Sequence, residues 1–195
     1  LSGFESVVAR VYSRYVDALA DGNAADFDDL LLKTVELFSH HAGVLERYRT
    51  RFRYVLVDAY QDTNRIQDVI TRKIAEGHGN LCATGDPDQS IYRWRGARVQ
   101  NILEFESDWP GAHVVRLEQN FRSVGNVLKA ADALIGHNRK RHHKGLFTDK
   151  EDGALIRVTG SGSELDEGHK VAEALLQAYA RGTPYQEMAV FYRTN

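Results

Sequence analysis

The chain has 195 residues, 43% of them hydrophobic and 27% charged, as in globular proteins that bury a core. Its 25 basic and 27 acidic residues give a net charge of -2, which indicates no bulk affinity for nucleic acid but leaves room for a local basic groove. A single cysteine permits no internal disulfide and fits a reducing compartment, and no apolar run approaches the ~20 residues of a membrane span.

The N-terminal part of the chain predicts helices. Apolar residues recur at helical spacing from Phe4 to Ala20, and the pattern breaks in the polar stretch 21–26. It restarts after Asp26, a predicted N-cap, with Asp29 in the position of the acidic partner of a capping box. Residues 43–52 predict another short helix.

The rest of the chain alternates between strand and helix patterns. The predicted strands are 54–57 (buried), 80–84, 113–117, 154–160 and 188–193. The predicted helices are 64–77, 98–108, 124–138 and 164–182. This alternation predicts a parallel α/β sheet, and such sheets bind ligands at the carboxyl ends of their strands. A polar connection spans 137–153, and 117–120 is a candidate hinge between two lobes.

The first polar cluster, "DAYQD", directly follows the strand pattern at 54–57. A carboxylate at a strand end, such as Asp58, is well placed to hold Mg²⁺ directly or through water. Aspartate is also common there as a turn or helix-capping residue, so this cluster alone leaves both interpretations open.

The second cluster, "TGDPDQSIYRWRGA", follows the next strand pattern at 84–97. Gln89 offers an amide that can sense a terminal phosphate or an attacking water. Beyond it, aromatic rings alternate with Arg93 and Arg95, a mixture that suits single-stranded nucleic acid because bases stack on rings. Core packing is the alternative for Trp94, but a Trp between two Arg and before a Gly is a poor core residue.

The third cluster, "LEQNFRS" at 117–123, places Arg122 after an aromatic residue near a helix start. An Arg there can reach across a cleft to a γ-phosphate, although an ordinary surface Arg is the alternative.

Together, "VDAYQDTN", "GDPDQSIYRWRGA", "LEQNFRS" and "VFYRTN" resemble the UvrD/PcrA/Rep family of superfamily one DNA helicases, over essentially the whole chain. The resemblance implies a RecA-like P-loop NTPase fold, an α/β architecture with a parallel sheet flanked by helices. The start at Leu1 and the end in a strand-like pattern predict an incomplete fragment of two lobes. The expected domains are a helical insert (1–25), the end of the first lobe (26–117) and the start of the second (118–195).

The resemblance also implies ATP-driven 3′-to-5′ movement along single-stranded DNA. Asp58 would hold Mg²⁺, Asp86 would support the metal through water, and Gln89 would sense the γ-phosphate of ATP. The implied catalytic residues are Asp58, Gln61, Gln89 and Arg122. The implied ATP contacts are Asp58, Asp86, Gln89, Phe121 and Arg122.

On the same resemblance, Tyr92 and Trp94 would stack on bases with support from Arg95, while Arg193 and Asn195 match a segment that touches DNA. The implied partners are single-stranded DNA, its junctions with duplex, and repair or replication proteins, with no membrane. The implied location is the bacterial cytoplasm, at the nucleoid.

Two features depart from the family pattern. Ala59 stands where the family has the Glu that activates the attacking water, and losing a general base typically slows a reaction ~10²–10⁴-fold. No G-x-x-x-x-G-K-[ST] phosphate loop occurs in the sequence. We therefore expect the isolated chain to have no ATPase activity.

Three alternatives stay open: a natural non-hydrolysing DNA-binding relative, the helicase part of a helicase–nuclease, and a protein-interaction module. Phe27 is either a DNA contact or a core residue. The other candidates have simpler explanations. Cys82 is expected to be a buried small hydrophobe, and the basic run at 139–144 to be a solvated loop, with contact to the DNA backbone as the alternative. The adjacent pairs His40–His41 and His142–His143 lack the spacing and partners of a zinc site.

Overall fold

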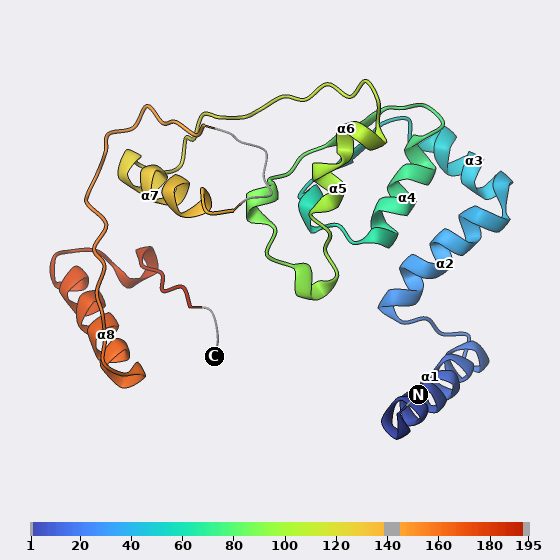
Figure 1. Cartoon of the computed structure of the whole chain (residues 1–195), viewed down its shortest axis with the longest axis horizontal. Helices are drawn as coiled ribbons and strands as arrows, with labels where there is room; N and C mark the ends of the chain where they lie inside the picture. The colour runs from blue at the N-terminus through green and yellow to red at the C-terminus, as the bar shows by residue number, and fades with distance from the viewer. Residues whose placement is uncertain (1, 139–144, 193–195) are drawn as a thin grey trace. The chain divides into compact units, whose positions relative to one another are not determined.

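The computed structural model describes residues 2–138 and 145–192 (Figure 1). Helices and a small parallel sheet make up these residues, so the predicted α/β class is confirmed. The chain divides into two compact units, each described here by itself. The first comprises the described parts of 1–119 and 131–147, and the second those of 120–130 and 148–195. The domain boundaries expected at residues 25 and 117 stay predictions.

Three helices begin the chain, and the cap of the second follows the predicted pattern. They are α1 (Gly3–Asp21), α2 (Phe27–His40) and α3 (Ala42–Arg51). The Asp26 carboxylate accepts the Asp29 amide at 2.8 Å, and the Asp29 carboxylate accepts the Asp26 amide at 3.4 Å. This reciprocal pair satisfies two amides that have no partner inside the helix, and so it determines where α2 begins.

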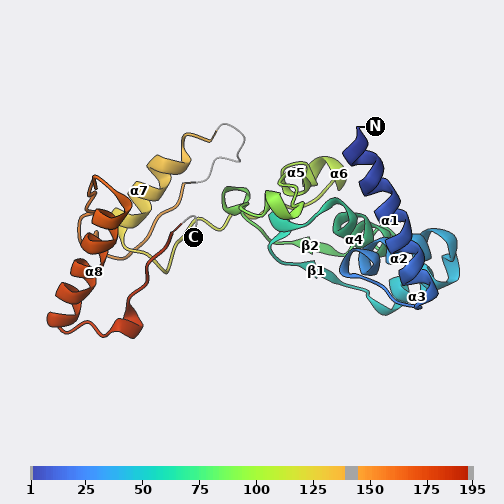
Figure 2. The same cartoon turned by 90° about the horizontal axis from the view of Figure 1, so that it is seen from below.

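The sheet of the first unit is a single βαβ element. Strands β1 (Val55–Val57) and β2 (Leu81–Ala83) pair in parallel, with Leu56 opposite Cys82, and α4 (Arg65–Ala75) connects them. Figure 2 shows the two strands side by side, with α4 next to them. The pairing continues beyond the strands, because the Thr84 amide donates to the Val57 carbonyl at 2.8 Å. The carboxyl ends of both strands therefore lie at one edge.

Several sequence predictions about strands and burial are wrong. Within the described residues, 113–117, 154–160 and 188–192 form no strand, since the only ladder among them joins β1 to β2 and a strand needs a hydrogen-bonded neighbour. Leu56, expected in a buried strand, is 76% exposed, and Cys82 is exposed as well. Their strand neighbours are half-buried, so the described part of the chain covers one face of this sheet.

The remaining helices follow the predicted positions with one break. The 98–108 pattern forms two short helices, α5 (Gln100–Leu103) and α6 (Phe105–Asp108), instead of one. Helices α7 (Gly125–Ile135) and α8 (Glu164–Ala180) match their predictions. Single 3-10 turns are η1 (Tyr60–Asp62), η2 (Pro87–Gln89), η3 (Arg93–Arg95) and η4 (Tyr185–Glu187). Among the described residues, no helix is long and apolar enough to cross a bilayer.

The N-cap of α4 provides a test of this architecture. The Asn64 side chain accepts the Gln67 amide at 2.9 Å, and the Gln67 side chain accepts the Asn64 amide at 2.9 Å. We expect Asn64→Ala to lower the free energy of unfolding by about 1 kcal/mol, measured by urea denaturation. Asn64→Asp keeps an acceptor at the cap and is the matched control. Equal losses in the two variants would show that the cap is not responsible.

Candidate functional site

The first site segment turns sharply at the end of β1. Asp58 is exposed, and its Oδ1 accepts the Ala59 amide at 2.9 Å. Ala59 has φ +49° and ψ +46°, a left-handed conformation that costs an L-residue roughly 1–2 kcal/mol. The turn η1 then begins at Tyr60. The predicted metal-binding carboxylate therefore sits at the carboxyl edge of the sheet, next to a strained residue that carries only a methyl group.

Gln61, a residue that is 6% exposed, joins the two strand ends through its side chain. Its Oε1 accepts the Asp86 amide at 3.1 Å, and its Nε2 donates to the Asp62 carboxylate at 3.3 Å. A Cβ at Gly85 would lie 2.5 Å from Gln61 Oε1 and 2.7 Å from Ile102 Cδ1, so only glycine fits there. Gln61 thus holds the two strand ends together.

Asp86 organises the turn that follows β2. Its Oδ1 accepts the Asp88 amide at 3.0 Å, and its Oδ2 accepts Nε2 of Gln89 at 2.8 Å. The predicted metal-supporting carboxylate and the predicted phosphate-sensing amide are therefore bonded to each other. Gln61, Asp86 and Gln89 form one hydrogen-bonded group, and Asp58 ends the adjacent strand.

The donor set at this edge decides what metal it could hold. The described residues contain no group of three His, Cys, Asp or Glu side chains arranged for a metal. Magnesium usually keeps several waters and binds through one or two carboxylates plus substrate phosphates. The exposed Asp58 carboxylate fits that mode of binding, in which the nucleotide brings most of the ligands.

The aromatic loop, defined here as Tyr92 to Gly96, carries the predicted DNA contacts. The Tyr92 and Trp94 ring centroids lie 6.5 Å apart, and Arg95 Cζ lies 5.4 Å and 4.9 Å from them, within cation–π range. Trp94 is 72% exposed, which excludes the core alternative for its ring in the described chain. Phe27 is 89% exposed at the start of α2, so it is not a core residue there.

Phe121 and Arg122 lie in the second unit. The Asn120 side chain accepts the amides of Arg122 (3.0 Å) and Ser123 (2.7 Å), and the Lys150 ammonium donates to the Arg122 carbonyl at 2.9 Å. These bonds order the backbone of Arg122, while the Phe121 ring is 74% exposed. Their approach to ATP stays a prediction. Arg193, Asn195, the run at 139–144 and its histidine pair lie outside the described residues.

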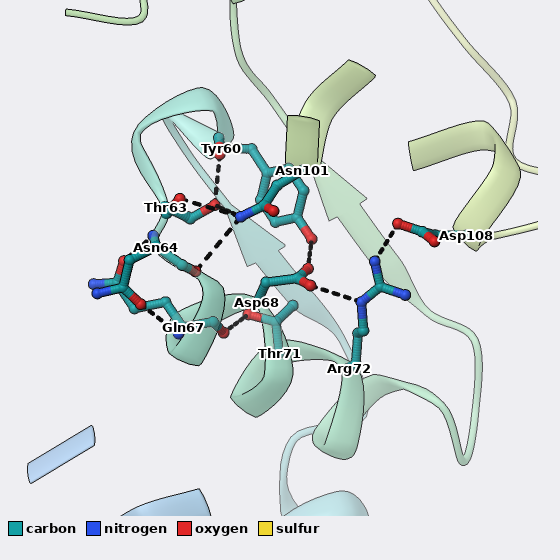
Figure 3. A network of polar contacts seen from close by, with 9 residues as sticks. All are labelled: Tyr60, Thr63, Asn64, Gln67, Asp68, Thr71, Arg72, Asn101 and Asp108. Carbon is teal, nitrogen blue, oxygen red and sulfur yellow. Dashed lines mark hydrogen bonds and ion pairs between the residues drawn. The ribbon is translucent and has the colours of Figure 1, made fainter. Parts of the chain in front are cut away.

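A buried polar network joins the turn at Tyr60 to helices α4 and α6, and the sequence alone did not indicate it (Figure 3). Tyr60 is fully buried, with its ring edge-on to Phe105 at 5.6 Å, and its hydroxyl donates to Asp68 Oδ1 at 2.5 Å. Asp68 also accepts Nε of Arg72 at 2.8 Å, and Arg72 pairs through Nη2 with Asp108. The i,i+4 spacing of Asp68 and Arg72 was the one signal available in the sequence.

Comparisons with known proteins agree with these motifs. Residues 2–110 match the UvrD/REP helicase N-terminal domain, and residues 115–195 match the UvrD-like helicase C-terminal domain. The chain is 45% identical over 189 residues to the ATP-dependent DNA helicases PcrA of Staphylococcus epidermidis and Staphylococcus aureus. These alignments cover 97% of this chain and 26% of each relative, so the chain spans about a quarter of their length.

Because the Tyr60 hydroxyl is buried and bonded to Asp68, we expect the free energy of unfolding to fall at alkaline pH. Burial, together with this hydrogen bond, raises the pKa of Tyr60 well above its ordinary value of about 10. Above about pH 10, the ordinary tyrosine pKa, Tyr60 of the unfolded chain loses its proton while folded Tyr60 keeps it. The stability that Tyr60 contributes is therefore lost as pH rises further. We expect the stability gap between wild type and Tyr60→Phe to be constant up to about pH 9 and to narrow as pH rises above about 10 in urea titrations.

Tyr12→Phe, which removes a hydroxyl from an exposed ring of α1, is the control for this measurement. A gap between wild type and Tyr60→Phe that stays constant over the whole range would contradict the prediction.

Proposed function

This chain belongs to the UvrD/REP helicase family, and from that premise we propose that it is part of an ATP-dependent helicase that moves 3′ to 5′ along single-stranded DNA. The observation that carries the proposal is the connection of an exposed aromatic–arginine loop to the strand ends that hold Asp58 and Asp86. A nucleotide-responsive edge joined to a base-stacking loop is what a DNA translocase requires.

For the nucleotide, we assign Asp58 to Mg²⁺, Asp86 to water-mediated support of the metal, and Gln89 to the γ-phosphate. The bond from Gln89 to Asp86 supports this assignment, because it holds the amide beside the carboxylate. When bound, the metal supplies neutralisation of phosphate charge. Gln61 keeps the two strand ends in register, and Phe121 and Arg122 contact ATP from the second lobe.

For DNA, we assign base stacking to Tyr92 and Trp94, with Arg95 supporting both rings, and further contacts to Arg193 and Asn195. In this mechanism, ATP closes the cleft between two RecA-like lobes and hydrolysis reopens it, moving the stacking rings along the strand. We infer that the partners are single-stranded DNA and its junctions with duplex, alongside repair or replication proteins at the bacterial nucleoid.

One observation favours a second candidate, an ATP-binding relative that scarcely hydrolyses its nucleotide. Ala59 lacks the carboxylate that would take a proton from the attacking water. The surrounding contacts of Asp58, Gln61 and Asp86 are nevertheless intact. Binding of nucleotide and DNA with negligible turnover would therefore fit this chain.

The DNA assignment is tested by replacing the exposed indole. Stacking of one base on an aromatic ring contributes roughly 1–3 kcal/mol, so Trp94→Ala should weaken binding of a fluorescein-labelled oligo-dT at least about tenfold in fluorescence anisotropy. Trp109→Phe changes the other Trp of the chain and should leave the affinity unchanged. Equal binding by wild type and Trp94→Ala would remove the main support for a helicase.

The nucleotide assignment is tested by phosphate release. With ATP, Mg²⁺ and oligo-dT, we expect the 195-residue chain to match a blank without protein. Ala59→Glu should not restore turnover, because the chain also lacks a phosphate-cradling loop. DNA-stimulated release by either form would contradict the inactivity that we propose.

A further inference from the structure

Asn101, in the short helix α5, makes an unusual set of contacts for a buried amide (Figure 3). The residue is 6% exposed, and its Nδ2 donates to the Thr63 carbonyl at 3.1 Å and to the Thr63 hydroxyl oxygen at 3.0 Å. The Asn64 carbonyl lies 3.5 Å from the same nitrogen. One side chain thus binds the backbone where η1 ends and α4 begins.

The aromatic loop is attached to the same place by its own backbone. Ala97, directly after the loop, forms an isolated antiparallel bridge with Asn64, and the Arg98 amide donates to the Thr63 carbonyl at 3.0 Å. Ala97 also donates to the Tyr92 carbonyl at 3.3 Å, which closes the loop on itself. The Asn101 amide therefore reinforces the junction from which the loop projects.

That junction continues into the nucleotide edge. The Thr63 hydroxyl, which accepts from Asn101, donates in turn to the Tyr60 carbonyl at 2.6 Å. Tyr60 directly follows the strained residue Ala59 and precedes Gln61, whose side chain bonds the Asp86 amide. These hydrogen bonds, together with the backbone of residues 59–61, thus connect the base of the aromatic loop to both strand ends.

We propose that Asn101 is a positioning residue: it holds the aromatic loop in a fixed register against the 60–64 turn and thereby orders the loop for single-stranded DNA. It contacts neither of the ligands that the proposed function assigns, and this inference rests on that function. Losing its amide removes the donor to the Thr63 hydroxyl oxygen and one of the two donors to the Thr63 carbonyl, which keeps the Arg98 amide. The loop is then freer to move, so DNA would have to order it on binding.

A merely structural role makes a different prediction from a positioning role. If Asn101 acts through the loop, its loss matters only while the loop can stack on DNA, so it should add little once Trp94 is gone. If Asn101 only stabilises the chain, its effect on binding should be unchanged by Trp94→Ala. A double-mutant cycle on DNA affinity separates these two roles.

The experiment measures oligo-dT anisotropy for the full 195-residue chain, for four single variants and for one double variant that combines Asn101→Leu with Trp94→Ala. We expect Asn101→Leu, which is close in volume but cannot donate, to weaken binding about tenfold, and Trp94→Ala to weaken it by at least as much. The double variant should bind as weakly as Trp94→Ala alone. Gln100→Leu, a change of the neighbouring half-buried amide of α5, should bind like wild type.

Thr63→Val is the fourth variant and guards against misfolding of Asn101→Leu. It removes the hydroxyl between Asn101 and Tyr60 while keeping the size of the side chain, and it should weaken binding severalfold. The positioning role alone would be overturned if the fold-losses in affinity of Asn101→Leu and Trp94→Ala multiply in the double variant. It would also be overturned if both Asn101→Leu and Thr63→Val bind like wild type. Absence of oligo-dT binding by wild type would instead overturn the proposed function, and the positioning role with it.

Discussion

The buried bond between the Tyr60 hydroxyl and the Asp68 carboxylate is the contact on which the candidate site depends. Tyr60 has no exposed surface, and it lies in the chain between the strained residue 59 and the bridging amide of Gln61. Its bond fixes the turn to α4, and Arg72 extends the connection to Asp108 at the end of α6. Because a buried carboxylate without partners is costly, these groups hold one another in a single arrangement. The edge of the sheet that carries the candidate site is therefore held in a fixed arrangement as well.

The helices and part of the site could be predicted from sequence because their determinants are local. Asp26 with Asp29 specifies the start of α2, and the apolar spacing from Phe4 onward specifies α1. The 113–117 segment was mistaken for a strand because its composition suits one, while pairing depends on a neighbour that its own residues do not encode. Exposure of Cys82 was missed for a related reason, since burial depends on what covers the sheet.

The site itself was only partly accessible to sequence reasoning. Motif resemblance selected Asp58, Asp86 and Gln89, and the structure adds the bond that joins the last two. Asn101 had no such signal, because its acceptors lie 37 and 38 residues earlier in the chain. Contacts of that range follow from the packing of α5 against η1, which no periodicity in the sequence reveals.

The open face of the sheet has a practical consequence. Leu56 and Cys82 are paired in register at the centre of the ladder, and both are exposed. Cys82 is also the sole thiol of the sequence. The rate at which Cys82 is alkylated therefore reports how accessible this face is. Labelling should be fast in this chain and slower whenever another segment or a partner covers the strands. A single reagent can thus compare coverage of the sheet in any longer form of the protein, without altering a residue.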